Sequence, residues 1–190
     1  MDGIQDWSDG EILQTGKCLQ EILRQYLCPE YVRDEDGILF TSPWDEEDYR
    51  VGIWLYDIQD HSPMAVEGAW LDETHRTFPP KATELSYMIF CNPRHGFGGL
   101  QRERVHGILN EILRAVYDNP TSERADGGSV GFSFLQESMD FKMQLWESFQ
   151  KPLSPAVYVK AAPVTIASRR MREAHKVETR EYGVRGREEP

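Results

Sequence analysis

The sequence has few cysteines and no long apolar run. Its cysteines are Cys18, Cys28 and Cys91, an odd set without the C-x-x-C spacing of many metal and redox sites. They are expected to be reduced, buried thiols. No apolar run approaches the roughly 20 residues that cross a bilayer. The first residues also lack the basic and apolar regions of a secretion signal. These absences predict a protein made in the cytoplasm that does not contact a membrane directly.

Basic residues are also too few to balance the acidic ones. The formal net charge is −11, so phosphates should repel the chain and no nucleic-acid partner is predicted. The charge is unevenly distributed, because residues 169–190 carry seven Lys/Arg and five Asp/Glu, whereas residues 1–168 carry a net charge of −13. The sequence therefore predicts one domain over residues 1–168 and a charged tail over residues 169–190.

Hydrophobic periodicity predicts helices that alternate with strands. Helices are expected over residues 8–27 with a Ser8/Glu11 capping box, from Leu100 to Asn119, and after Ser138. Strands are expected over Ile38–Thr41, Val51–Ile58, Leu85–Cys91, Val130–Phe134 and Ala156–Ala167, with a polar linker at 121–128. Pro163 cannot donate to a ladder, which predicts an edge, a bulge or a break in the last strand. The fold class is α+β, a mostly antiparallel or mixed sheet packed by two principal helices.

Four segments in a fixed order resemble a known family. They read TFPPKATELSYMIFCNP (77–93), ERVHGILNEILRAVYDNP (103–120), VGFSFLQES (130–138) and LWESFQKPLSPAVYVKAAPVTI (145–166). This order is similar to the tail-terminator, or cap, family of contractile phage-tail-like injection systems, as found in antifeeding-prophage-type particles. The resemblance covers about half of the chain and consists of ordered motifs rather than one catalytic signature.

The resemblance implies a structural protein with no catalytic residues, metal or cofactor. It implies a homo-hexameric ring that closes the distal end of the tube and sheath, ends polymerisation and fixes particle length. The implied partners are the inner tube protein, the sheath protein and the tape-measure protein. The protein would reside in the cytoplasm during assembly and afterwards in the phage-tail-like particle.

Exposed aromatic and charged residues indicate where such a ring would make contacts. One candidate is the acidic loop from Ser42 to Asp48, and another is the glycine-rich loop after Pro93. The last strand is a candidate for β-addition at an open edge, and the tail is a candidate docking arm of opposite charge to the body. The candidate interface residues are Trp44, Asp45, Glu46, Glu47, Asp48, Arg94, Phe97, Val157, Val159, Arg169, Arg170 and Arg172.

Two other function classes remain as alternatives. Residues 127–131 spell G-x-S-x-G, which would make Ser129 the nucleophile of a small serine hydrolase, although a loop precedes this serine and a strand follows it. Residues 94–104 could form a phosphate- or nucleotide-binding module before a helix. Glu103 and His106 have the spacing of a metal-binding helix but lack a second copy of the motif, so they are expected to be surface residues.

Overall fold

The computed structural model describes residues 10–61, 70, 72, 74–92, 99–125 and 127–173. The chain divides into two compact units. Unit 1 consists of Met1–Ser62 and Ala82–Ile166, and unit 2 consists of Pro63–Lys81 and Ala167–Pro190. The C-terminal passage from unit 1 to unit 2 thus lies close to residue 168, where the sequence predicts that the tail begins.

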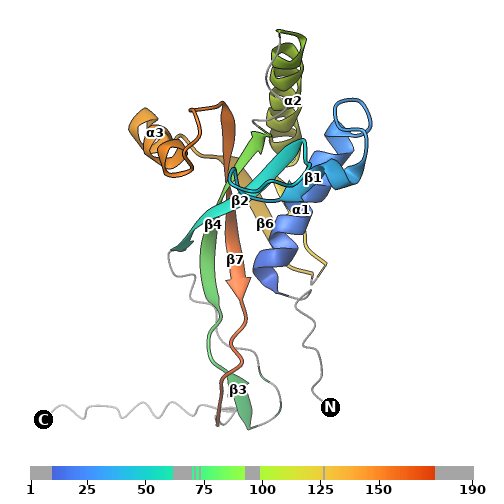
Figure 1. Cartoon of the computed structure of the whole chain (residues 1–190). Coiled ribbons are helices and arrows are strands. Elements are labelled where there is room, and N and C mark those ends of the chain that lie inside the picture. Colours follow the sequence, from blue (N-terminus) through green and yellow to red (C-terminus); the bar gives the residue numbers. More distant parts are fainter. Residues whose placement is uncertain are drawn as a thin grey trace, which may run out of the picture. The chain divides into compact units, whose positions relative to one another are not determined.

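The described part of unit 1 is a mixed sheet with helices on both faces (Figure 1). Its helical elements are α1 (Glu11–Leu27), η2 (Glu35–Gly37), α2 (Gly99–Asp118) and α3 (Met139–Ser148). Its strands are β1 (Ile38–Phe40), β2 (Val51–Asp60), β4 (Lys81–Cys91), β5 (Thr121–Glu123), β6 (Ser129–Phe134) and β7 (Ala156–Ile166). The strand order is β1-β2-β4-β7-β6-β5, with β1 parallel to β2 and antiparallel pairing for β2–β4, β6–β7 and β5–β6. The predicted α+β class is confirmed.

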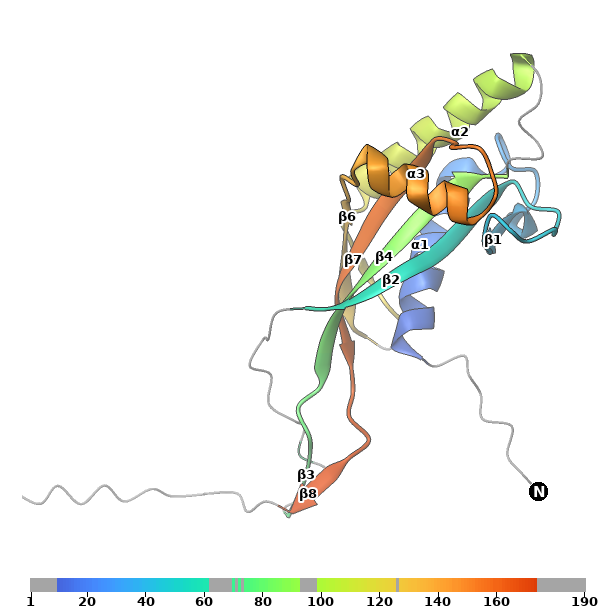
Figure 2. The same cartoon turned by 60° about the vertical axis from the view of Figure 1, so that its left-hand side comes forward.

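Two hydrophobic cores lie on opposite faces of this sheet. Helices α1 and α2 cover one face and α3 covers the other (Figures 1 and 2). Strand β2 shows why the sequence looks apolar on both sides, because Val51 and Ile53 belong to the first core whereas Trp54 packs against the second. Successive strand residues point to opposite faces, so an interior strand covered on both sides needs apolar residues at nearly every position. The interior position predicted for this strand is confirmed.

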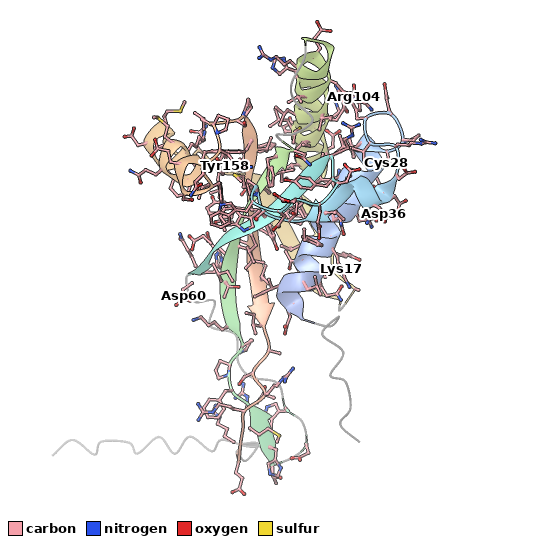
Figure 3. All side chains as sticks on the ribbon, viewed as in Figure 1. Lys17, Cys28, Asp36, Asp60, Arg104 and Tyr158 are labelled. Atoms are coloured by element: carbon pink, nitrogen blue, oxygen red, sulfur yellow. The ribbon has the colours of Figure 1, made fainter. Side chains whose placement is uncertain are left out.

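Aromatic rings dominate the second core. The α3 residue Trp146 is fully buried, and its ring meets those of Phe90 and Phe149 at centroid distances of 6.2 Å. Tyr158 of β7 lies beside α3 in the same cluster (Figure 3), and burial raises the pKa of its hydroxyl. Edge-to-face ring pairs of this kind hold α3 in place although it is a short helix.

The helices form largely where their periodicity predicts them. Helix α1 begins at Glu11, later than expected, and its N-cap is Gly10. No side chain caps this end, so the predicted Ser8/Glu11 capping box is wrong. Ser8 itself lies outside the described residues. The predicted cap of α3 is confirmed, since the Ser138 hydroxyl oxygen accepts a hydrogen bond from the Phe141 backbone N–H at 3.1 Å.

The last long strand does not lie at an edge. Strand β7 lies between β4 and β6, so the predicted edge position is wrong. Its pairing with β6 ends at Ala162, so Pro163 lies just beyond that ladder and removes no donor from it. The candidate interface residues Val157 and Val159 are buried in the first core, at 7% and 0% exposure. Their side chains hold the sheet against the helices rather than facing a partner.

Two further strand pairs have no counterpart in the sequence prediction. Strand β5 occupies part of the predicted linker and forms the end of the sheet next to β6. In unit 2, β3 (His75–Thr77) pairs antiparallel with β8 (Met171–Glu173). Residues 171–173 therefore belong to a two-stranded ribbon rather than to an unstructured tail.

None of the helices described here combines the length and apolar character that a membrane span requires.

Candidate interaction surfaces

The acidic loop consists of Trp44, Asp45, Glu46, Glu47 and Asp48, between β1 and β2. Its conformation is fixed from within. The Asp45 carboxylate accepts hydrogen bonds from the Ser42 backbone N–H at 2.7 Å and from the Thr41 hydroxyl at 2.8 Å. These bonds, that of Ser42 first, hold the pKa of Asp45 below its ordinary value. The loop is thus an ordered turn that displays its other acidic side chains.

Trp44 is held in place at the surface. Its ring meets Phe149 edge-on at a centroid distance of 4.8 Å, yet 56% of the residue remains exposed. All four acidic residues that follow it are exposed. An exposed aromatic ring held in place is typical of a protein contact site, because such a ring contributes area at low entropic cost, and polar side chains are typical of the rim of such a site.

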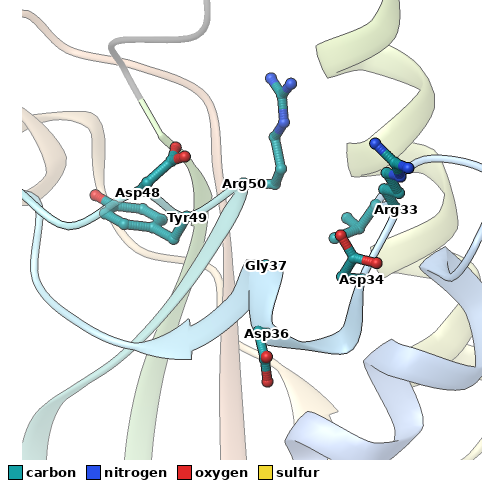
Figure 4. A pocket seen from close by; sticks show the side chains of 8 residues that line it. Arg33, Asp34, Asp36, Gly37, Asp48, Tyr49 and Arg50 are labelled. Carbon is teal, nitrogen blue, oxygen red and sulfur yellow. The ribbon is translucent and has the colours of Figure 1, made fainter.

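A hollow of about 320 Å³ lies beside the acidic loop. Its lining residues are Val32, Arg33, Asp34, Asp36, Gly37, Asp48, Tyr49 and Arg50. Figure 4 shows that Asp48 and Arg33 lie on opposite sides of the hollow and that Asp36 points away from Arg50. Because these charges are mixed in sign and diverge, the hollow does not present convergent groups to a small ligand.

An apolar patch is formed by Leu113 and Tyr117 of α2 and Phe134 of β6. The three residues are 46%, 77% and 42% exposed. They line a hollow of about 510 Å³ together with Asn110, Arg114 and Asp118. Periodicity assigns Leu113 to the helix stripe that faces the sheet and Phe134 to the buried side of its strand, and the structure corrects both assignments. Grouped large apolar side chains at a surface indicate a protein contact.

The arginine face belongs to the β3–β8 ribbon. Arg76 pairs with Arg172 across the ribbon, and the Phe78 N–H donates to the Arg170 carbonyl at 3.0 Å. Since directly opposed residues and residues two apart share a side of a ribbon, Arg76, Phe78, Arg170 and Arg172 lie on one face. The bridge between Trp70 and Arg76 adds a second ring. We call Trp70, Arg76, Phe78, Arg170 and Arg172 the arginine face.

The rings on this face hold the guanidinium groups. The Arg170 guanidinium carbon lies 4.5 Å from the Phe78 ring centroid and that of Arg172 lies 6.0 Å away. The Arg76 guanidinium carbon lies 5.4 Å from the Trp70 ring centroid. Such contacts orient a guanidinium group, whose N–H donors lie along the edge of its plane. The sequence predicts Arg170 and Arg172 as contact residues, and that stays a prediction. Their association with Arg76 and the two rings has no local signal, because residues 70–78 and residues 170–172 are far apart in the chain.

Of the remaining predicted contact residues, the structure describes Arg169 alone. Arg169 is exposed, as a docking residue must be, although no contact of its side chain is described. Arg94 and Phe97 lie outside the described residues, as does most of the glycine-rich loop. The phosphate-binding alternative falls largely in the same segment.

The catalytic alternatives gain no support from the geometry. Ser129 opens strand β6 after a turn, whereas a nucleophile elbow places its serine between a strand and a helix. Its only later histidine, His175, lies outside the described residues. Glu103 and His106 are both exposed on α2, as predicted for surface residues. Within the described residues, no group of three or more His, Cys, Asp or Glu side chains could hold a metal ion.

Comparison with solved structures finds the same fold in two particle proteins. One is the PVC sheath/tube terminator in the extended state, from a cryo-EM structure of an extracellular contractile injection system. The match has a TM-score of 0.65 at 16% identity and covers 93% of this chain and 64% of that chain. The other is the tube-terminating cap of the anti-feeding prophage, with a TM-score of 0.60 at 16% identity, over 89% of this chain and 60% of that chain. This chain therefore spans less than two thirds of either solved chain.

None of the curated proteins matches this sequence. The family comparison is more specific, because the model for the Pvc16 N-terminal domain matches residues 14–179. That range contains most of unit 1, both strands of the ribbon, the acidic loop and the apolar patch. It also contains all four segments on which the terminator resemblance depends, and the resemblance is confirmed. This chain belongs to the Pvc16 N-terminal domain family.

Proposed function

We propose that this protein is a structural cap that terminates the tube and sheath of a contractile injection particle. The observation that carries the proposal is the family match over residues 14–179, and two solved terminators share the fold. Such a protein acts by presenting surfaces in a fixed arrangement, so it needs no turnover and no cofactor. The surfaces found here are of that kind, namely an ordered acidic loop, an apolar patch and an arginine face.

The cap is a homo-hexameric ring in this proposal. A ring of one repeated contact requires two different surfaces on each subunit, since only a heterologous interface closes into a ring with more than two members. The acidic loop and the arginine face differ in sign and chemistry, which supports such a contact. The inner tube protein, the sheath protein and the tape-measure protein are the proposed further partners, with assembly in the cytoplasm.

The cap would fix particle length by occupying the end at which subunits add. In a producing strain, deletion of the gene should therefore give tubes or sheaths of irregular length or with unstable ends. Electron microscopy of purified particles measures the length distribution directly. Reintroduction of the wild-type gene is the control, and particles of uniform length with normally capped ends in the deletion strain would refute the capping role.

The oligomeric state gives a second test. Light scattering after size exclusion should give a mass near six times the 22.0 kDa of one chain, alone or when tube ends are supplied. A Leu113→Ser/Tyr117→Ser variant tests whether the apolar patch contributes to this assembly. Both side chains are largely exposed, so the variant should stay folded while its assembly weakens. A chain that stays monomeric alone and at tube ends would contradict the ring.

A further inference from the structure

We propose that the arginine face of one subunit docks on the acidic loop of the neighbouring copy. This inference rests on the proposed ring and names the contact that would close it.

The arginine face concentrates positive charge on one side of a small ribbon. Arg170 and Arg172 are exposed and Arg76 is partly exposed. Like charges opposed across a strand pair repel each other, as Arg76 and Arg172 do here. Their contacts with Trp70 and Phe78 offset part of this cost. Carboxylates from a partner suit the exposed Arg170 and Arg172, because a guanidinium group binds a carboxylate through two parallel N–H donors.

The described residues of the ribbon bury little surface within unit 2. No residue described in unit 2 is buried. A two-stranded ribbon without a hydrophobic core is marginal at best in water. A segment of this kind gains order from the surface on which it packs. The arginine face is thus suited to an interface and not to standing alone in solvent.

The acidic loop provides the complementary surface on the same chain. Asp45 maintains the turn through its bonds to Thr41 and Ser42, while Glu46 and Glu47 extend from it as exposed carboxylates. Trp44 adds an exposed ring on which an arginine side chain can stack. The loop thus offers both groups that guanidinium binds, a carboxylate and an aromatic face.

A second copy fits the arginine face better than a nucleic acid does. Phosphates would bind the arginines equally well, but residues 1–168 carry a net charge of −13 and would repel a polyanion. The same negative charge attracts the ribbon of another copy. Because the two surfaces differ, the contact is heterologous. Each subunit contacts one neighbour through its arginine face and the other neighbour through its acidic loop.

Charge reversal tests this contact. The ribbon variant carries Arg170→Glu and Arg172→Glu, and the loop variant carries Glu46→Lys and Glu47→Lys. Each should weaken self-association at least about tenfold, because like charges then face each other across the interface. The control matched to the ribbon variant carries Lys17→Glu and Arg102→Glu. It makes the same charge change as the ribbon variant, at two exposed helix positions, and should associate as the wild type does. Sedimentation of all four proteins at low and at physiological salt gives the comparison.

Restoration makes the test specific. In an equimolar mixture of the ribbon and loop variants, an alternating ring contains only opposite-sign contacts, so association should return to near the wild-type level. A chain that carries all four reversals should also recover. Far-UV circular dichroism confirms that each variant is folded, as expected for substitutions at exposed positions.

The outcomes separate this inference from the proposed function. If the wild type forms rings and the ribbon variant forms them equally well, the arginine face does not make the ring contact, although the cap function stands. If the ribbon variant forms rings that no longer bind tube ends, the arginine face contacts the tube and not the neighbouring copy. If a single-stranded oligonucleotide binds the wild type and not the ribbon variant, the arginine face binds a nucleic acid instead. In both cases the inferred contact is wrong and the cap function stands. If the wild type never forms a ring, even at tube ends, both proposals are wrong.

Discussion

Unit 1 and unit 2 are stabilised by different means. In unit 1 the sheet is buried by two cores, and the strands β2, β4 and β7 carry apolar residues toward both. In the described part of unit 2 no residue is buried, and the contacts include one strand pair, a few hydrogen bonds and three arginine–ring contacts that involve two rings. Burial of apolar area provides most of the free energy of folding, whereas surface cation–π contacts contribute little. Unit 1 therefore contains the cores that stabilise the fold, and unit 2 is the part that we propose meets a partner.

The difference should appear most strongly when the same substitution is made in each unit. Phe90→Ala removes a fully buried ring from the second core and should lower the free energy of unfolding by about 3–5 kcal/mol. Phe78→Ala removes a partly exposed ring from the ribbon and should cost less than about 1 kcal/mol. Urea unfolding followed by circular dichroism measures both. Equal losses at the two positions would contradict the comparison.

A smaller effect should follow from crowding the core of unit 1. A Cβ atom at Gly52 would overlap the ring of Phe90, so the two residues fit only because glycine has no side chain. Gly52→Ala should lower the free energy of unfolding by about 1–3 kcal/mol. In a double-mutant cycle, Gly52→Ala combined with Phe90→Leu should lose less than the sum of the two single changes. An additive cycle would show that the ring is not what excludes a side chain here.

A third effect tests an ion-pair network in unit 1. The Glu84 carboxylate accepts from His61 Nδ1 at 2.6 Å and lies 3.3 Å from Lys160 Nζ, which links the residue after β2 to β4 and β7. The bond to His61 first, and Lys160 second, lower the pKa of Glu84 below its ordinary 4.5. Its contribution is therefore present above about pH 4.5 and is lost as the pH falls through the lower folded pKa.

Glu84→Gln should remove this acid-side dependence at a cost of less than about 1 kcal/mol near neutral pH, because the network is partly exposed. Urea unfolding from pH 3 to pH 7 provides the measurement, because this range spans the ordinary titration of carboxyl groups. Glu103→Gln, at an exposed position of α2, is the control and should leave the pH profile unchanged. An unchanged profile in Glu84→Gln would refute the network's role.

The smallest effect on stability should come from removing the end of the chain. Truncation after Ser168 deletes β8 and thus dissolves the ribbon, but it leaves both cores of unit 1 intact. The free energy of unfolding should change by less than about 0.5 kcal/mol. Circular dichroism and urea unfolding test the fold, and sedimentation tests assembly, which should weaken. Loss of the fold would show that the tail belongs to the core, and normal assembly at low and high salt would refute its role in docking.

The sequence by itself determined the main elements of unit 1 and the family. The helical stripe of α2, the two-sided apolar pattern of β2 and the Ser138 cap are local signals, and each is found in the structure. The sequence also located the acidic loop, since exposure follows from its composition. These features depend on residues within one or two turns of each other, so periodicity and capping rules suffice.

Only the tertiary structure decided which strands became neighbours. Pro163 suggested an edge, yet β7 lies between β4 and β6, because its apolar residues are needed in both cores and the proline falls beyond the β6 ladder. The arginine face joins residues around Arg76 with residues around Arg172, and no local pattern links segments so far apart. Likewise, Leu113 and Phe134 are surface residues although each belongs to an apolar pattern of its element. Strand pairing and the extent of burial are properties of the whole chain, and they determined where this protein can meet a partner.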